Sequence, residues 1–233
     1  MKWPQILHPD RAPWRWLRRG PGLDLGADPV GVLALRLHAD LPDDQGVRSV
    51  LVTAADDDQA GLDTTLALAW CLAEQGGHTV LLVDGAFGDP AFGDTLGVAG
   101  LPGLTDWLDA ASQAAPQSLA SLVQATGHAR IHLLPQGDAA QATTLRASAV
   151  PELVSQARGQ HDFVLVRSSL QGDVHRALAF SAAMDAALLV AVEEQTQVEQ
   201  ITRGQRLLDD CGARRVALVL AVRTGTPSAA QRP

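Results

Sequence analysis

The chain has 233 residues, a length that suits a single α/β domain with a substantial core. Its composition, 46% hydrophobic and 19% charged residues, is ordinary for a globular protein. No apolar run approaches the roughly 18 residues of a membrane span, and no signal peptide is evident at its start, so the protein is expected to be cytoplasmic. The net charge of −8 argues against a nucleic-acid-binding surface.

Residues 1–27 form a basic, tryptophan-rich arm that differs from the rest of the chain. Within the first 19 residues, five basic side chains face one aspartate, and three of the five tryptophans lie there. Tryptophan beside arginine favours membrane interfaces and protein docking sites, although the prolines disfavour a long amphipathic helix. The arm either packs on its own domain or docks on a partner. For docking, the candidate residues are Trp3, Trp14, Arg15, Trp16, Arg18 and Arg19.

The stretch from Asp28 to Leu41 is predicted to be a helix before the first core strand. Its leucines are expected in the core, namely Leu33, Leu35, Leu37 and Leu41.

A strand, a loop and a helix follow, and the rest of the chain is organised around them. Ser49–Thr53 is a β-branched run typical of a buried parallel strand, and Thr64–Glu74 has helical spacing that ends at Gly76. The loop Ala54–Asp63 between them holds four aspartates and no lysine. Backbone N–H groups and an ammonium surround the phosphates in a P-loop. The pattern therefore predicts a P-loop frame without its phosphate chemistry.

Further strands and helices alternate along the chain, as in an open α/β sheet. His78–Asp84 is the clearest strand, and Asp84 stands at its carboxyl end, where such sheets bind ligands. The other predicted elements are the strands Ala129–Gly137, His161–Arg167, Met184–Val192 and Arg215–Val222, the last two expected to be buried, and the helices Val150–Gln160 and Thr196–Cys211. The predicted fold is a three-layer α/β domain with a mostly parallel sheet and helices on both faces.

No catalytic or metal-binding constellation is evident elsewhere. The seven histidines show no metal-ligand spacing, and the two cysteines lie far apart in the sequence. Neither a catalytic residue nor a metal ligand is predicted.

From about Asp28 to Thr226 the chain resembles the cytoplasmic ATPase domain of bacterial polysaccharide tyrosine kinases, or BY-kinases. These capsular and exopolysaccharide co-polymerase domains belong to the ParA/MinD-like deviant P-loop group. The family's Gly-Lys-Thr/Ser, Asp-x-Asp and Asp-Ser/Thr-Pro-Pro motifs correspond to Leu62-Asp63-Thr64, Val83-Asp84-Gly85-Ala86 and Val166-Arg167-Ser168-Ser169. The segment Asp89–Leu108 resembles the polysaccharide kinases more than their plasmid-partition relatives.

The resemblance implies a degenerate nucleotide site. Its positions are Asp63, Thr64, Asp84, Ala86, Arg167 and Ala221. Thr64 matches the family pattern, whereas Asp63 replaces the lysine, Ala86 and Arg167 replace aspartates, Ser169 replaces a proline and Ala221 replaces an asparagine. A lysine contact with phosphate near 4 Å is worth about 4 kcal/mol at a partly screened site, and an aspartate reverses its sign. We therefore expect no ATP or Mg²⁺ cofactor. The chain has no tyrosine, which excludes tyrosine autophosphorylation.

These observations predict a P-loop domain over residues 28–224, flanked by the arm and a disordered tail over 225–233. The expected function is that of a catalytically inactive pseudo-kinase or pseudo-ATPase, hence not an enzyme. It would be a scaffold or regulator of bacterial exopolysaccharide or cellulose biosynthesis or secretion, acting by protein–protein binding. The expected partners are a membrane polysaccharide synthase, a co-polymerase or an active ATPase paralogue, with a homodimer as a further option and membrane association only through a partner.

Two alternatives stay open. In the first, the chain is a divergent nucleotide-binding ATPase of the MinD/ParA type that positions or regulates a membrane polysaccharide synthase, with Arg167 and Asp84 in its site. In the second, it is a spatial-positioning protein akin to MinD, although no C-terminal amphipathic helix of the kind a MinD-style membrane switch needs is evident.

Overall fold

The computed structural model describes residues 29–41, 47–87, 91–96, 98, 100–112, 118–138, 149–171 and 174–221. The predicted arm and tail lie outside these ranges, so the proposed boundaries at 27 and 225 stay predictions. Among the helices of the described ranges, none has both the length and the apolar character that crossing a bilayer requires.

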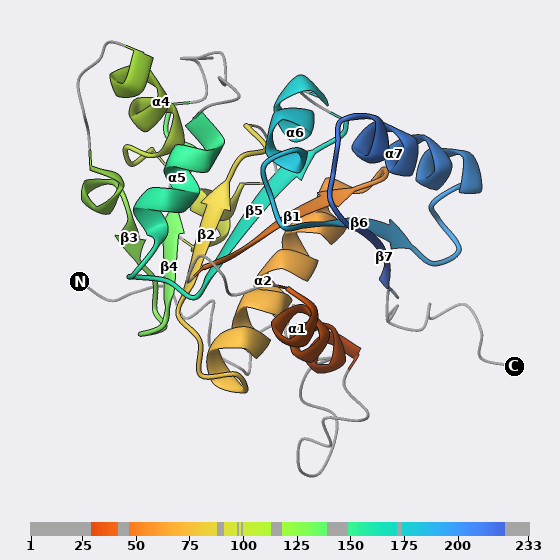
Figure 1. Ribbon diagram of the computed structural model, residues 1–233, viewed down its shortest axis with the longest axis horizontal. Coiled ribbons are helices and arrows are strands. Elements are labelled where there is room, and N and C mark those ends of the chain that lie inside the picture. Colours follow the sequence, from red (N-terminus) through yellow and green to blue (C-terminus); the bar gives the residue numbers. More distant parts are fainter. Residues whose placement is uncertain are drawn as a thin grey trace, which may run out of the picture.

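A seven-stranded sheet forms the centre of the molecule, in the strand order β3-β4-β2-β5-β1-β6-β7 (Figure 1). Neighbouring strands are parallel except β3, which runs antiparallel to β4. The strands are β1 (Arg48–Ala54), β2 (Val80–Asp84), β3 (Gln124–Ala125), β4 (Ile131–Leu134), β5 (Phe163–Ser169), β6 (Ala186–Val192) and β7 (Val216–Ala221). The helices are α1 (Pro29–Asp40), α2 (Asp58–Glu74), α3 (Phe92–Leu96), α4 (Leu104–Ser112), the 3-10 helix η3 (Leu119–Ser121), α5 (Ala149–Ala157), α6 (Val174–Ser181) and α7 (Val198–Asp210).

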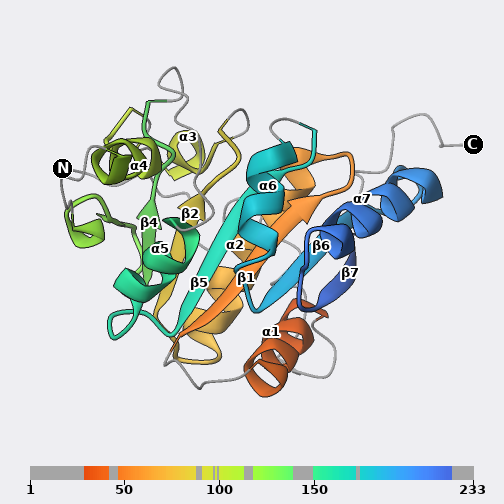
Figure 2. The ribbon, with the colours of Figure 1, turned by 45° about the horizontal axis from the view of Figure 1, so that its top comes forward.

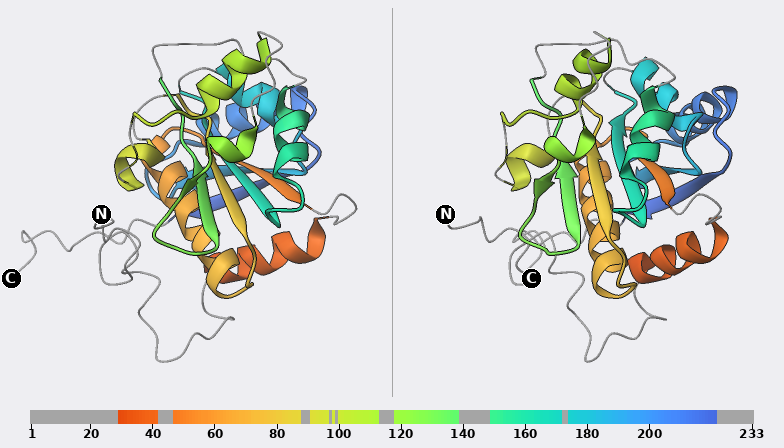
Figure 3. Two further views of the ribbon diagram at one scale, coloured as in Figure 1. Left: turned by 90° about the vertical axis from the view of Figure 1, so that its left-hand side faces the viewer. Right: turned by 60° about the vertical axis from the view of Figure 1, so that its left-hand side comes forward.

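Helices cover both faces of the sheet because successive strand residues point to opposite sides. On β1, Val50 and Val52 pack with α1, α2 and α3, whereas Leu51 packs with α4, α5, α6 and α7. Figure 2 shows α2 behind the central strands and α5 and α6 in front of them, and in Figure 3 α2 and α5 lie on opposite sides of the sheet. The predicted three-layer fold is confirmed.

Helix α2 begins at Asp58, so the expectation of a long loop reaching to Asp63 is wrong. The loop after β1 is short because Asp57 caps the helix. The Asp57 carboxylate accepts a hydrogen bond from the Ala60 N–H at 3.1 Å, and the Asp57 carbonyl accepts one from the Gly61 N–H at 3.2 Å. Aspartate is among the preferred N-cap residues, and its charge complements the helix dipole.

The observed elements differ from expectation in three respects. Strand β7 was expected to be buried, but it is an edge strand, and Leu218 and Leu220 are each 54% exposed. Leu35 on α1 was expected in the core and is 52% exposed, while Leu37 and Leu41 are buried. Strand β3 and helix α6 were not predicted, since two strand residues and one short helix leave little periodic signal.

Candidate functional site

The candidate site lies where β1, β2 and β5 end at their carboxyl termini. Strand β5 lies between β2 and β1, so the chain skips a strand position between β1 and β2. Ligands of open α/β sheets bind outside the carboxyl ends of the strands. Three groups meet at this edge, namely Asp84 at the end of β2, Arg167 and Ser169 at the end of β5, and the loop after β1.

Asp84 and Arg167 form a buried ion pair between adjacent strands. They are directly opposite in the register of β2 and β5, and Arg167 Nη1 lies 3.2 Å from Asp84 Oδ1. Their side chains are 0% and 1% exposed. The second carboxylate oxygen, Oδ2, accepts a hydrogen bond of 2.7 Å from the Phe92 N–H at the start of α3. The resemblance assigned these two positions to the nucleotide site, and here they bind each other.

Burial dominates the electrostatics of Asp84. Removal from water raises the pKa of its carboxyl above the ordinary value, while the Arg167 guanidinium and the N–H groups of Phe92 and Ala86 act in the opposite direction. Through the contact with the Phe92 N–H, Asp84 is bonded to nearby backbone.

The guanidinium of Arg167 is only partly satisfied. Its central carbon lies 5.8 Å from the centre of the Phe92 ring, within the range of a cation–π contact. Its Nε and Nη2 atoms are buried and have no hydrogen-bond partner among the residues that the structure describes. Buried donors without partners are rare in folded proteins.

The aspartates of the loop after β1 bond to their own chain. Asp58 Oδ2 accepts a hydrogen bond of 2.6 Å from Ser169 Oγ, and Asp56 Oδ1 accepts one of 2.6 Å from Thr196 Oγ1. With Asp57 capping α2, the carboxylates of Asp56, Asp57 and Asp58 therefore all accept hydrogen bonds from the protein at the place where a P-loop would present donors to phosphate.

Gln171 ties the end of β5 to the same loop. Its side-chain Nε2 donates to the carbonyl of Ala55 at 2.7 Å, and its backbone N–H donates to Ser169 Oγ at 3.0 Å. Sequence reasoning did not find Gln171 or Thr196, because their partners are more than 100 residues away in the chain, 116 for Gln171 and 140 for Thr196.

The remaining candidate positions do not all converge. Asp63 lies on α2, where its Oδ1 accepts a hydrogen bond of 2.8 Å from Gln59 Nε2, and Thr64 is a buried residue of the same helix. Ala86 follows β2 and is buried. Ala221 ends β7, from which β6 and β1 separate β5. The six arm residues proposed for docking lie outside the described ranges.

The described residues do not fit a magnesium nucleotide held in the P-loop manner. Mg²⁺ is usually bound by one or two carboxylates together with phosphate oxygens and waters. Both oxygens of Asp84 are engaged, by Arg167 and by Phe92, and the loop presents carboxylates rather than an ammonium. In the first turn of α2, the N–H groups of Ala60 and Gly61 are already bonded to Asp57.

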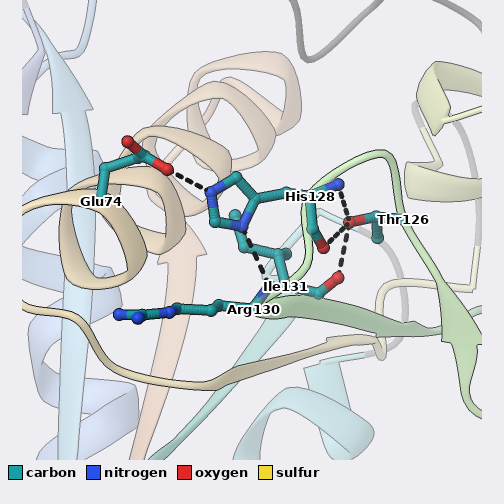
Figure 4. Close-up of polar contacts among 5 residues, drawn as sticks. All are labelled: Glu74, Thr126, His128, Arg130 and Ile131. Carbon is teal, nitrogen blue, oxygen red and sulfur yellow. Dashed lines mark hydrogen bonds and ion pairs between the residues drawn. The ribbon is translucent and has the colours of Figure 1, made fainter.

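Histidines cluster at the opposite, amino ends of the strands. Figure 4 shows His128 between α2 and the turn before β4, with its Nε2 2.5 Å from Glu74 Oε1 and its Nδ1 accepting the Arg130 N–H at 3.1 Å. Both ring nitrogens are used, so His128 joins two elements and is not free to act as a base. No group of three or more potential metal ligands occurs in the part of the chain that the structure describes.

Comparisons of the whole chain identify its fold. No protein-family model matches the sequence, and no curated protein sequence matches it. Among solved structures, the kinase domain of the Escherichia coli tyrosine kinase ETK is 18% identical, with 90% of this chain and 83% of that chain covered and a TM-score of 0.69. The VpsO kinase domain is 20% identical, covering 82% and 93%, with a TM-score of 0.64. The Pyrococcus furiosus cell division ATPase MinD is 22% identical, covering 74% and 71%, with a TM-score of 0.57.

The chain therefore has the fold shared by BY-kinase domains and ParA/MinD ATPases, as the sequence predicted. At these sequence identities the similarity establishes the fold alone, and the ligands and activities of those proteins are not thereby assigned to this chain.

The expectation that the chain is not an enzyme is corrected by the same comparisons. The solved structures that share its fold include kinase domains and ATPases. Missing motif residues argue against one way of holding a nucleotide, but the strand-end edge that carries chemistry in this fold is present. An enzymatic function is thus compatible with the architecture, and its absence does not follow from the altered motifs.

Proposed function

We propose that the protein is a scaffold or regulator of bacterial exopolysaccharide or cellulose biosynthesis or secretion that acts by binding other proteins. In this proposal it works at the cytoplasmic side of the inner membrane and reaches the membrane through its partner. The partner is a polysaccharide synthase, a co-polymerase or an active ATPase paralogue. The link to polysaccharides rests on the resemblance of residues 89–108 to the polysaccharide kinases.

One observation supports binding rather than conventional nucleotide chemistry above all others. The edge at which a P-loop protein holds phosphate and magnesium is filled by the protein's own contacts, with Asp84 on Arg167 and Asp58 on Ser169. We infer that ATP with Mg²⁺ is not its cofactor. The proposal concerns how the protein acts on its partners and does not deny it an activity of another kind.

The fold supports a second candidate function. Since MinD and a ParA family protein from Chlorobium tepidum share the fold and are ATPases, the chain would be a divergent nucleotide-binding ATPase that positions or regulates a membrane polysaccharide synthase. This candidate requires a nucleotide to displace the contacts at the strand ends, which makes it separable by measurement.

The basic arm is the docking element in this proposal. Tryptophan and arginine are the residues most often found at interface hot spots, and truncating one such residue commonly costs 2 kcal/mol or more, roughly thirtyfold in affinity. The arm carries three tryptophans within an otherwise acidic chain.

Capture of the partner by the full-length protein tests the proposal. Polysaccharide synthase and co-polymerase from the source membranes should be retained by the immobilised protein. Deleting residues 1–20 should abolish that retention and leave the melting temperature within a few degrees. The double change Trp14→Ala, Trp16→Ala should reproduce most of the loss.

Val198→Ser provides the matched control, because Val198 is an apolar side chain of α7 that is 71% exposed. This variant should retain the partner as well as the unchanged protein does. If the deletion unfolds the domain, the arm is structural and the docking role is excluded. If the arm variants capture the synthase normally, the partner surface is elsewhere.

A further inference from the structure

An apolar groove of about 290 Å³ runs between α1 and the C-terminal part of α2, which lie side by side (Figures 1 and 3). Ala34 and Leu35 of α1 and Leu72 of α2 line it, together with the rings of His38 and His78, whose centroids are 4.8 Å apart. Leu35 is 52% exposed, so none of the described residues covers this apolar rim. The groove therefore offers an apolar wall and a pair of aromatic rings to a further group.

The size of the groove suits one ring system rather than a helix. Pockets for small ligands begin at roughly 300 Å³, so the groove is at the lower limit of that range. Among side chains, tryptophan combines a large apolar area with a ring that stacks favourably on other rings at centroid distances of roughly 4.5–7 Å. An inserted indole would contact Leu35 and stack on the histidine pair.

The arm that precedes α1 carries indoles within reach of the groove. Trp14 and Trp16 stand upstream of α1, whose third residue, Gly31, already lines the groove. The lining residues of α1 extend over roughly 10 Å of helix. Residues 17–28, which connect Trp16 to α1, can span roughly 40 Å when extended. The glycines and the proline among them favour a reversal of chain direction.

Charge favours the same contact. The first 19 residues carry five basic side chains and one aspartate, in a chain whose net charge is −8. Two half-exposed carboxylates stand near the histidine pair. Asp162 Oδ2 lies 3.9 Å from His78 Nδ1, and Glu74 is the neighbour of Gln75, which lines the groove. With an indole in the groove, the guanidinium of Arg15 remains in solvent, where it can approach these carboxylates.

We propose that the groove between α1 and α2 binds the Trp14-Arg15-Trp16 segment of the same chain, with one indole inserted against Leu35 and the histidine pair. A short flexible tether gives the segment an effective concentration in the millimolar range. A groove with a dissociation constant of about 1 mM for the free segment is then about half occupied. So weak a contact agrees with a melting temperature that changes little when the arm is removed.

The contact regulates the docking role of the arm, and this consequence rests on the proposed function. An indole cannot lie in the groove and on a partner at the same time, so the partner binds only the released arm. The apparent affinity of a ligand falls with the fraction of the protein that is competent to bind it. Half occupancy of the groove therefore weakens partner binding about twofold.

Fluorine NMR of the full-length protein labelled with 5-fluorotryptophan tests the contact itself. The signals of Trp14 and Trp16 are assigned by their loss in Trp14→Phe and Trp16→Phe. At least one of them should be displaced from its position in a synthetic peptide of residues 1–20. Leu35→Ser removes the apolar rim and should move the displaced signal to the peptide position. Leu220→Ser is the matched control, because Leu220 is 54% exposed on β7, and it should leave the signal displaced.

Partner capture by the full-length protein supplies a second readout. Leu35→Ser should increase retention of the partner about twofold, because it releases the arm. The change Trp14→Ala, Trp16→Ala should instead reduce retention, since it removes the docking residues. Leu220→Ser should capture the partner as the unchanged protein does.

Several outcomes would overturn the inference. One is that both signals coincide with those of the peptide, and another is a displaced signal that Leu35→Ser leaves unchanged. A displacement that grows with protein concentration as the protein dimerises would assign the groove to the arm of a second copy. Weaker capture by Leu35→Ser would mean that the partner itself occupies the groove. If no variant captures a partner, the proposed function fails, and the NMR signals still decide whether the arm lies in the groove.

Discussion

Arg167 illustrates how a single residue can change the use of a strand end. The resemblance places an aspartate at this position, near magnesium, and the chain has a cation there. Arg167 Nη1 lies 3.2 Å from Asp84 Oδ1 on the neighbouring strand, and both side chains are buried. Removing one member of such a pair leaves an isolated buried charge, which is far more unfavourable than removing both.

Arg167→Met alone should therefore lower the free energy of unfolding by about 3–5 kcal/mol. The double change Asp84→Asn, Arg167→Met should recover most of that loss, since neither remaining side chain is charged. Urea denaturation of the two variants beside the unchanged protein measures both values. A single variant as stable as the unchanged protein would show that the pair does not exist in solution.

The histidine pair at the other end of the sheet predicts a pH dependence. His161 Nε2 lies 3.1 Å from His132 Nδ1, and burial lowers the pKa of both rings below 6.5, the ordinary value. The neighbouring His132 ring lowers the pKa of His161 further, whereas the hydrogen bond with the Ala157 backbone and the charge of Asp162 act in the opposite direction. A lowered pKa means that the unfolded chain binds more protons in this range.

Stability should therefore fall as the pH drops from 6.5 through the lowered pKa values of the folded state, and the full contribution should be present above 6.5. Each unit of pKa difference corresponds to about 1.4 kcal/mol. His161→Phe should flatten the curve, because it removes one of the titrating rings. Denaturation midpoints at pH 7.5 and 5.5 compare the two proteins. Parallel curves would assign the dependence to other groups.

At the scale of elements, β7 shows what an edge position does to an apolar strand. Its sequence reads as a buried strand, yet no strand of the described sheet follows it, and two of its leucines remain half exposed. In the register of β6 and β7, Leu218 lies opposite Leu189, which is fully buried under the helices of that face. The two leucines thus have the same orientation and different surroundings.

Leu218→Thr should change the free energy of unfolding by no more than about 0.5 kcal/mol, because an exposed side chain loses little on truncation and threonine suits a strand. Leu189→Ala should cost about 2–5 kcal/mol through the cavity that it leaves. Thermal and urea unfolding of both variants measure the contrast. Equal losses would mean that Leu218 is covered in solution.

The same strand and helix α2 show how much of the fold the sequence contained. The strands around Val50, Leu82, Leu165 and Leu188 were predictable, because continuous apolar runs are typical of buried parallel strands. The exposure of β7 was not predictable, because its edge position depends on the order of the strands in the sheet. The start of α2 was missed although Asp57 is a good N-cap residue, because the family pattern favoured a loop at that place.

For the whole molecule, nucleotide binding can be measured as a change in the stability of the folded state. Any ligand of the native state must raise the melting temperature, by an amount set by its concentration relative to its dissociation constant. With carboxylates at the loop and Asp84 engaged, ATP with Mg²⁺ at millimolar concentration should not raise the melting temperature. Asp63→Lys alone should not restore binding, because the loop would still present Asp56, Asp57 and Asp58.

A calorimetric melt with and without ATP and Mg²⁺ makes this measurement, with a nucleotide-binding ATPase of the same fold as the positive control. A clear stabilisation that disappears in Asp84→Ala would establish the divergent ATPase instead.

The sequence allowed the residues of the candidate site to be predicted, but not the contacts between them. Asp84 and Arg167 could be placed at strand ends from local patterns alone. That they are neighbours depends on β5 lying next to β2, and the two residues are 83 positions apart. The partners of the loop carboxylates, Ser169 and Thr196, come from still more distant segments, 111 and 140 positions away. Such contacts follow from topology, which local periodicity does not specify.

The position of the ion pair also bears on how the sheet assembles. Asp84 and Arg167 are exact neighbours only in the observed register of β2 and β5, in which Val83 lies beside Val166. A shift by one residue would place Asp84 beside Val166 or Ser168 and leave two separated charges inside an apolar layer. Neighbouring valines and leucines discriminate poorly between such registers, since they are similar in size and polarity. The ion pair thus favours the observed register of β2 and β5 over the shifted registers.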